Sequence, residues 1–211
     1  MKIPLLVSCF APGEPIGTED HEHEMGSKAV QKLIVGLGNP GRKYLATRHS
    51  IGMVACNRLA EHYNTQWEYH RKYKAYTCTI ITPQKHHVHL LKSNQYMNVN
   101  GKSVKKAVHH LSIPLENIYL LHDDLERQVG KLSWKAAGSA GGHNGVKSVI
   151  GCLGDDKIRR LRIGIGRPAK GADEEEVSEY VLSEFPEDEQ DVVDGTLDEV
   201  VRMLKDEIIE N

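Results

Sequence analysis

Residues 32–41 read KLIVGLGNPG, and this stretch decides the fold. Its first half is a short apolar run of the kind that forms a strand buried on both faces, and Asn39-Pro40-Gly41 is a turn signal that ends it. Ser50 then precedes a segment, residues 51–59, whose apolar side chains recur at helical spacing. The chain therefore begins its ordered part with a buried strand, a loop and a helix.

The remaining sequence alternates strand-like and helix-like segments. Residues 75–81 (AYTCTII) and 87–91 (HVHLL) are separated by a turn-like segment and predict a hairpin. Strand-like runs follow at 117–125, 130–135 and 159–166, and helical spacing occurs at 104–111, 146–150 and 192–208. This alternation predicts an α/β fold, a single three-layer domain with a mixed, mostly parallel twisted sheet and helices on both faces.

The chain is long enough for one domain and its hydrophobic core. Residues 1–30 show no periodicity and are predicted to be a flexible N-terminal extension, and residues 31–211 are predicted to form the domain, which ends in an acidic helix. No apolar run approaches the ~20 residues that span a bilayer, and we expect no membrane segment. The four cysteines are scattered, which favours reduced thiols over a disulfide framework or a zinc site.

The net charge of −2 hides a strong separation along the chain. Residues 1–30 carry a net charge of −3, residues 31–172 of +15 and residues 173–211 of −14. A segment as basic as the middle one attracts a polyanion such as a nucleic acid. The alternative is a solvated surface that the acidic tail neutralises, and charge alone does not separate these two interpretations.

Three glycines after the first strand, Gly36, Gly38 and Gly41, satisfy the G-x-G-x-x-G pattern of dinucleotide-binding folds. In that pattern the third glycine lies within a helix, whereas here Pro40 precedes it and the next helix is delayed to about Ser50. We therefore interpret the glycines as a tight loop that presents Asn39.

His49 stands in TRHS, directly before the first predicted helix, where an imidazole can exchange protons near neutral pH. A single histidine is more often structural. Asp123 or Asp124, at the end of a predicted strand, is a candidate to orient it, as the acid does in hydrolytic triads. The sequence has no G-x-S-x-G elbow and no cysteine in a nucleophile context, so we expect direct attack by water.

Other histidines suggest metal binding only weakly. HEHE at 21–24, the group His86, His87 and His89, and the pair His109 and His110 all lack the H-E-x-x-H spacing. We expect them to be solvated, and we expect no metal ion.

Asparagine recurs in three glycine-bearing loops, as Asn39 in NPG, Asn98 in MN-x-x-G and Asn144 in GGHNG. An amide both donates and accepts hydrogen bonds, which suits a peptide backbone or a water molecule, although asparagine beside glycine is also common in turns. The loop GSAGGHNGVK fits a phosphate or a peptide group, or is a plain strand-to-helix connection. The basic residues near it favour phosphate: Lys131, Lys135, Lys147, Arg160, Arg162 and Arg167.

Five motifs in this order, LIVGLGNPG-x-x-Y-x-x-TRH, YMN-x-x-G-x-x-V, HDDL, GSAGGHNG-x-K and RLRIGIGRP, resemble the bacterial-type peptidyl-tRNA hydrolase family along residues 31–205. The resemblance implies hydrolysis of the ester that joins a peptide or an N-blocked amino acid to the 3′ ribose of tRNA. It implies that His49 is the general base, that Asp123 orients it, and that a tetrahedral oxyanion forms. The other implied site residues are Asn39, Asn98 and Asn144 for the peptide and water, Tyr44 and Met97 in the cleft wall, His143 nearby, and Lys135 and Arg162 on the tRNA side.

The resemblance also implies a monomer without cofactor or metal, working on peptidyl-tRNA in the cytoplasm, with the mitochondrion as the alternative. Three residues depart from the family pattern: Ser50 follows His49 in place of a frequent asparagine, Ser133 replaces a frequent basic residue, and Arg167 replaces a frequent histidine. A second hypothesis is an RNA-binding factor, because relatives in plant organelles serve in intron splicing. The hydrolytic residues His49, Asp123 and Asn39 are all retained here, which favours hydrolysis.

Overall fold

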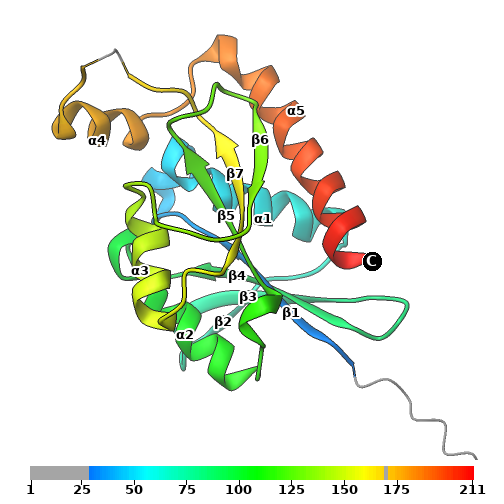
Figure 1. Ribbon diagram of the computed structural model, residues 1–211. Coiled ribbons are helices and arrows are strands. Elements are labelled where there is room, and N and C mark those ends of the chain that lie inside the picture. Colours follow the sequence, from blue (N-terminus) through cyan, green and yellow to red (C-terminus); the bar gives the residue numbers. More distant parts are fainter. Residues whose placement is uncertain (1–28, 169–170) are drawn as a thin grey trace, which may run out of the picture.

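The computed structural model describes residues 29–168 and 171–211 (Figure 1). Its strands are β1 (Gln31–Gly36), β2 (Glu68–His70), β3 (Ala75–Ile81), β4 (His87–Ser93), β5 (Ile118–Asp124), β6 (Leu132–Lys135) and β7 (Arg159–Gly164). Its α-helices are α1 (Ile51–His62), α2 (Gly101–His110), α3 (Asn144–Leu153), α4 (Glu174–Leu182) and α5 (Glu187–Leu204). Short 3-10 helices are η1 (Arg42–Tyr44), η2 (Arg48–Ser50), η3 (Met97–Val99) and η4 (Leu115–Asn117), and a π turn, η5 (Lys205–Ile209), extends α5.

All seven strands belong to one mixed sheet, in the order β2-β3-β4-β1-β5-β7-β6. The four central strands β4, β1, β5 and β7 are parallel, whereas β2, β3 and β6 join antiparallel at the two sides. The predicted α/β fold with a mixed sheet is therefore confirmed, but its parallel part is limited to the centre. The antiparallel pairs β2–β3 and β3–β4 follow from their short connections, because only a long crossover returns a chain for parallel pairing. Strand β6 pairs antiparallel with β7 although α3 lies between them in the chain.

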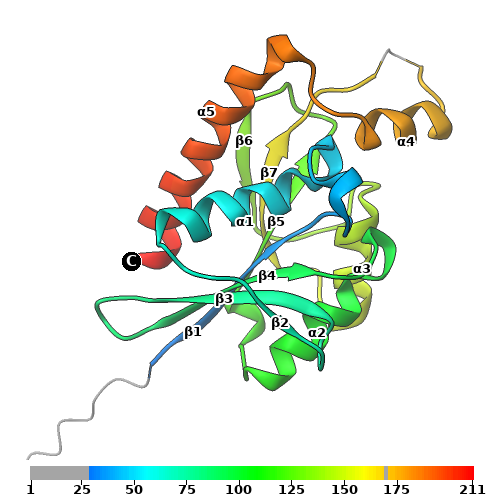
Figure 2. The same ribbon diagram turned by 180° about the vertical axis from the view of Figure 1, so that it is seen from behind.

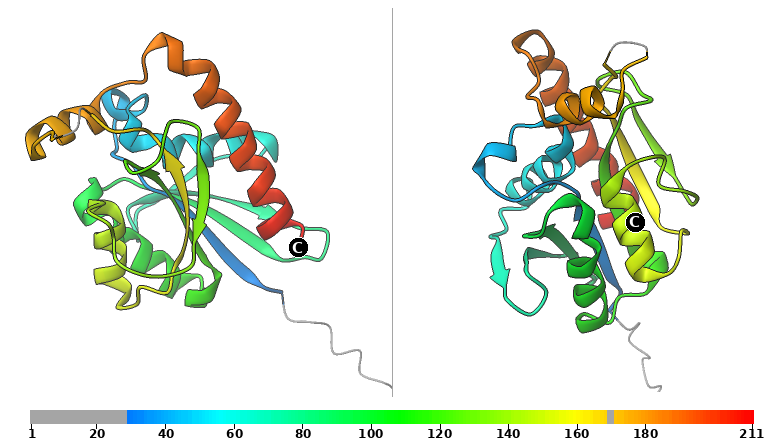
Figure 3. Two further views of the ribbon diagram at one scale, coloured as in Figure 1. Left: turned by 45° about the horizontal axis from the view of Figure 1, so that its top comes forward. Right: turned by 90° about the vertical axis from the view of Figure 1, so that its left-hand side faces the viewer.

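Helices cover both faces of the sheet (Figures 1 and 2). Side chains alternate along β1, so that Ile34 faces α1 and α5, whereas Leu33 and Val35 face α2 and α3. The two helical layers are also visible when the molecule is viewed from the side (Figure 3). Such burial of both faces explains why β1 is apolar at every position from Leu33 to Val35.

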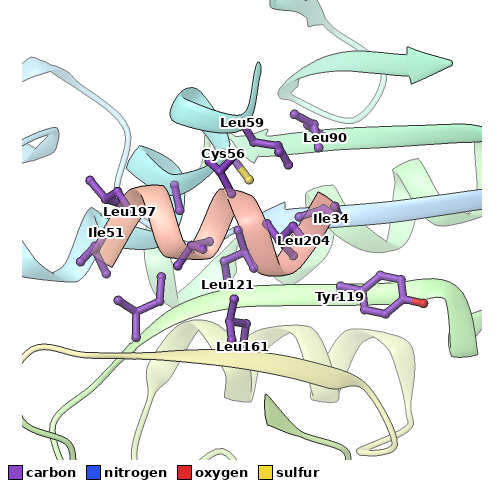
Figure 4. Close-up of a cluster of buried hydrophobic side chains, with 14 of the residues drawn as sticks. Ile34, Ile51, Cys56, Leu59, Leu90, Tyr119, Leu121, Leu161, Leu197 and Leu204 are labelled. Carbon is purple, nitrogen blue, oxygen red and sulfur yellow. The ribbon is translucent and has the colours of Figure 1, made fainter. Parts of the chain in front are cut away.

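The C-terminal helix α5 is part of the core despite its acidic sequence. Leu197 and Leu204 belong to the same buried cluster as Cys56 of α1 and Leu121 of β5 (Figure 4). Leu204 is fully buried, which stabilises the fold by roughly 1.5–3 kcal/mol. The acidic C-terminal segment is therefore a structural element, and its charged face points away from the sheet.

Two glycines allow α1 to approach the sheet closely. A Cβ atom at Gly52 would lie 2.2 Å from the carbonyl oxygen of Leu121, and one at Gly36 would lie 2.4 Å from the carbonyl oxygen of Gly52. The glycines after β1 thus serve helix packing and a turn, with Gly41 at a φ of 103°. No α-helix begins within this glycine pattern, so the geometry is not that of a dinucleotide fingerprint.

The predicted segments are present within the described residues, with two additions. Strand β2 and helix α4 were not predicted, because three residues are too few for a periodic signal and α4 buries only Val181. Ser50 stands at the start of α1, but its hydroxyl lies 3.4 Å from the Asn39 N–H and makes no cap bond within α1. The predicted extension and the HEHE motif fall largely or wholly within residues 1–28, which lie outside the described residues.

None of the helices in the described part of the chain is long and apolar enough to cross a membrane.

His89 is a buried histidine in β4 whose hydrogen bonds require the neutral form. The Thr79 hydroxyl lies 2.9 Å from its Nδ1, and its Nε2 lies 2.9 Å from the side-chain oxygen of Gln31. Since the amide oxygen only accepts, Nε2 carries the proton and Nδ1 accepts from the hydroxyl. Burial, with a smaller contribution from His87, lowers the pKa of His89 to about 4. The expectation that this histidine is solvated was wrong.

Acid should therefore destabilise the fold through His89 before the carboxylates titrate. In the unfolded chain the imidazole binds a proton below pH ~6.5, whereas in the folded chain it stays neutral down to about pH 4, so stability is lost as the pH falls. Between pH 7 and pH 5 the free energy of unfolding should fall in the wild type. In His89→Gln we expect this fall to be smaller by about 2 kcal/mol. Urea unfolding at both pH values measures this. Equal losses in the two proteins would contradict the assignment.

Candidate active site

Several loops meet at the carboxyl ends of the central parallel strands. Asn39 follows β1, Asp123 is near the end of β5, and Met97 follows β4. His49 lies in η2 before α1, and His143 is the residue before α3. Because parallel strands end at the same edge of the sheet, residues from five separate segments gather in one place.

Asp123 is the centre of this group. Its side chain lies between two imidazoles: Nδ1 of His49 is 3.0 Å from both carboxylate oxygens, and Nε2 of His143 is 2.8 Å from Oδ1. Asp123 is 4% exposed, so its charge is almost fully withdrawn from water. A buried carboxylate needs such hydrogen-bond donors, and the two histidines supply them.

The hydrogen bonds of His143 fix where its proton lies. Its Nδ1 accepts from the backbone N–H groups of Gly145 and Val146, at 3.1 and 3.2 Å, and so caps α3. Nδ1 is therefore unprotonated, and Nε2–H donates to Asp123. His49 likewise donates Nδ1–H to Asp123 when it is neutral, which leaves its Nε2 with an unshared electron pair. His49 thus has one ring nitrogen held by Asp123 and the other free to accept a proton.

Burial by itself raises the pKa of Asp123, but the charges and hydrogen bonds of His143 and His49 outweigh it and hold this pKa below its ordinary value. The carboxylate therefore stays ionised. His122, the preceding residue, donates Nδ1–H to the Asp123 carbonyl at 2.7 Å. Burial, followed by the nearby His143, lowers the pKa of His122 to about 3, so this imidazole stays neutral beside the site.

Asn39 connects the first loop to the segment after β4. Its side-chain oxygen accepts from the Met97 N–H at 2.8 Å, and within the described residues its amide NH₂ group makes no hydrogen bond. Met97 in turn is 5% exposed and packs against Gly145 at the start of α3, where a Cβ atom would lie 2.4 Å from the Met97 sulfur. The Asn39 oxygen is thus committed to structure and its NH₂ group is the available donor.

Three further predicted site residues lie at the surface around this group. Tyr44, in η1, is half-buried and its ring meets that of Tyr96 edge to face at 6.3 Å. Asn98, in η3, and Asn144, the first residue of α3, are both exposed. Asn98 follows Met97 and Asn144 follows His143 in the chain. Each exposed amide is therefore next to one of the residues that contact Asn39 or Asp123.

The two predicted tRNA-side residues differ in their surroundings. Arg162, on β7, lies 3.3 Å from Asp124, so part of its charge is already paired. Lys135, the last residue of β6, forms no ion pair with any residue that the structure describes. Arg167, one of the departures from the family pattern, pairs with Glu126 at 3.2 Å and is exposed. Ser133, another departure, is half-buried in β6.

Arg48 is a residue that the sequence did not single out. It is 5% exposed and its guanidinium lies between the rings of Tyr180 and Phe185, 4.5 Å from each centroid. It donates to Glu189 at 2.7 Å and to the Ile165 carbonyl at 3.3 Å. No local pattern predicts this, because its partners lie more than 100 residues away in the chain.

Backbone contacts also join the segment before His49 to the segment after α4. The Arg48 N–H donates to the Ser183 carbonyl at 3.0 Å, and Thr47 forms a bridge with Glu184. Helix α4, the start of α5 and the segment between them therefore hold the residue directly before His49.

The prediction that Arg160 is an accessible basic residue was wrong. The sequence placed it in a basic rim around the glycine-rich loop, but it is 1% exposed and is not available to a ligand. It donates to the carbonyls of Gly138 and Ser139, at 2.5 and 2.9 Å. These bonds fix the loop that leads to His143, and they explain why a buried cation is tolerated here.

His49, Asp123 and His143 are also the one group within the described residues whose side chains offer three metal-ligand atoms close together, all within 4.8 Å of one another. In the observed geometry both imidazoles direct an N–H at the carboxylate. A metal ion would have to displace these protons, so the hydrogen-bonded arrangement and a metal-bound one exclude each other.

The chain is similar in sequence to known proteins along most of its length. The sequence model described as peptidyl-tRNA hydrolase matches residues 33–211. Peptidyl-tRNA hydrolase of Rickettsia bellii (strain RML369-C) is 39% identical over 170 residues, covering 80% of this chain and 88% of that protein. The protein of the same name from Listeria monocytogenes serotype 4a (strain HCC23) is 40% identical over 159 residues, covering 75% and 82%.

The fold agrees as well. The crystal structure of peptidyl-tRNA hydrolase from Acinetobacter baumannii superimposes with a TM-score of 0.77 at 35% identity, covering 85% of this chain and 90% of that one. The family match begins within β1 and covers the other six strands and every candidate site residue. The chain belongs to the peptidyl-tRNA hydrolase family.

Proposed function

We propose that this protein hydrolyses the ester between a peptide, or an N-blocked amino acid, and the 3′ ribose of tRNA, with water activated by His49. One observation carries the proposed mechanism: Nδ1 of His49 is held by the buried Asp123 carboxylate, which leaves Nε2 as the accepting atom. Family membership supports the substrate.

In the proposed reaction, Nε2 of His49 takes a proton from water as the oxygen attacks the ester carbonyl carbon. Asp123 stabilises the imidazolium that forms, because its carboxylate stays ionised. The tetrahedral oxyanion needs a donor, and the NH₂ group of Asn39 is available for it. The C–O bond to the ribose then breaks, the imidazolium returns its proton to the 3′ oxygen, and the products are a free peptide acid and tRNA.

The resemblance implied only that His143 lies near the site, and the proposal gives it a role. Its two ring nitrogens bond to Asp123 and to the start of α3, so we assign it to holding the carboxylate in place. The surface residues Tyr44, Asn98 and Asn144, with Met97 behind them, are proposed to contact the peptide. Amides suit this task, because they pair with a backbone whatever the side chains are.

Lys135 and Arg162 are proposed to face the tRNA phosphates near its 3′ end. Both are cationic side chains on neighbouring strands, and cations on a strand edge position a nucleic-acid backbone without reading its sequence. Lys135 is favoured as the stronger contact, because Asp124 already shares the charge of Arg162.

We further propose that residues 31–211 act as a monomer that needs no metal ion or cofactor. His49 and His143 both donate an N–H to Asp123, and a metal ion would have to displace these protons. This arrangement supports a reaction without a metal ion. The place of action remains a prediction: the cytoplasm, with the mitochondrion as the alternative.

Replacement of His49 is the direct test. We expect His49→Ala to lower kcat by roughly 10²–10⁴-fold, the range typical of a lost general base. Release of the blocked amino acid from N-acetyl-aminoacyl-tRNA, measured in chelator, provides the readout. His110→Ala, an exposed histidine on α2, is the matched control and should keep full activity. Unchanged turnover in His49→Ala would exclude the mechanism, and tRNA binding without turnover in the wild type would exclude the reaction.

Arg48 is expected to act as a positioning residue for His49. Arg48→Lys keeps the charge but loses the planar group between Tyr180 and Phe185, and we expect kcat to fall roughly tenfold with little change in KM, because small displacements of a catalytic group are costly. Arg58→Lys is the control, since Arg58 also links to α5, through Asp194 and Asp198, without adjoining His49. A purely structural role for Arg48 predicts lower Tm in both variants and unchanged kcat per folded molecule.

A further inference from the structure

The outer side of helix α2 bears a basic groove that the proposed mechanism does not use. Its volume is about 530 Å³. The residues that line it are Tyr73, Lys74, Gln95, Lys102, Ser103, Lys105, Lys106, His109 and Cys152. Four of these are lysines and none is acidic, so the groove has the charge that an anionic ligand requires.

The sequence of α2 produces this surface. Val104 and Ala107 are buried against the sheet, whereas Lys102, Lys105 and Lys106 are exposed. With His109 they occupy positions i, i+3, i+4 and i+7, which share one face of a helix. From Lys102 to His109 the helix rises by about 10 Å, roughly the rise of three nucleotides at ~3.4 Å each.

The positive charge of this groove is not neutralised by the rest of the described molecule. None of its four lysines takes part in an ion pair with any described residue. The acidic helix α5 lies on the opposite face of the sheet, where Asp194 and Asp198 pair with Arg58 of α1. The fold thus separates the two charges across the sheet, and the α2 side stays basic.

The groove adjoins the candidate active site. Gln95, in its lining, lies two residues before Met97. Ser103 of α2 accepts a hydrogen bond from Ser93 and donates one to the Lys74 carbonyl, at 3.1 and 3.2 Å. These bonds join the helix to the end of β4 and to the turn before β3, so the groove has a fixed position relative to the site.

We propose that this groove binds the phosphate backbone of the substrate's tRNA, at nucleotides beyond the single-stranded 3′ end. The proposal rests on the proposed function. A nucleic acid fits better than an acidic peptide, because every tRNA carries a phosphate at each nucleotide, whereas the attached peptides have no common charge. Each phosphate contact releases counterions and adds to the salt dependence of binding.

The test compares two double variants with the same loss of charge. Lys105→Gln/Lys106→Gln removes two charges from the groove and keeps good helix formers. Lys85→Gln/Lys205→Gln removes two charges elsewhere, in the β3–β4 turn and after α5. Each protein is assayed on full-length N-acetyl-aminoacyl-tRNA, and on two short esters of a CCA trinucleotide that carry either a neutral blocked amino acid or an acidic peptide.

On the full-length substrate at about 0.1 M salt, the groove variant should lose roughly five- to tenfold in kcat/KM relative to the control variant. For the groove variant, the negative slope of log kcat/KM against log salt concentration should become shallower by about two. Both short esters should be hydrolysed as by the wild type. Equal rates for the two variants on full-length tRNA would overturn the proposal, and so would a loss that includes the neutral short ester.

A loss on the acidic-peptide ester alone would assign the groove to the peptide and overturn the proposal. A loss on that ester together with full-length tRNA would show attraction of anions in general, without preference for the tRNA backbone, and would also overturn it. Failure of the proposed function is distinct, since the wild type would then hydrolyse none of the three substrates.

Discussion

The buried carboxylate of Asp123 is the constraint on which the site depends. A charge withdrawn from water is tolerated only when donors surround it, and here the donors come from two distant segments, as His49 and His143. Strand β5 places the carboxylate at the edge of the sheet, and the two imidazoles must approach it from opposite loops. The same bonds fix both ring orientations, so one buried charge defines the accepting nitrogen of His49 and the start of α3.

Two buried arginines fix the loops that carry these histidines. Arg160 bonds to two carbonyls of the loop before His143. Arg48, the residue directly before His49, contacts Tyr180 of α4 and Glu189 of α5. Both cations lie in the interior because carbonyls, aromatic rings or a carboxylate replace their hydration. The acidic C-terminal region therefore serves the site in two ways, as an apolar layer over α1 and as the partner of Arg48.

The sheet also separates charge. Acidic side chains of α5 pair with Arg58 on one face, whereas the lysines of α2 remain unpaired within the described residues on the other. A polyanionic substrate is attracted to one side of such a molecule, and the field orients it before contact. The charge separation visible along the chain is thus converted into a separation in space, because the acidic helix packs against α1 and not against α2.

The sequence by itself determined the α/β class, most of the elements and the family, because hydrophobic periodicity and short glycine-bearing motifs are local properties. It also drew attention to His49 and Asp123 as a pair. Only the tertiary structure decided that His143 bonds to Asp123, that Arg160 is buried and that Arg48 meets residues 180–189. Those contacts join segments between about 20 and 140 residues apart. Local patterns carry no information about such pairs, since packing of the sheet and helices brings them together.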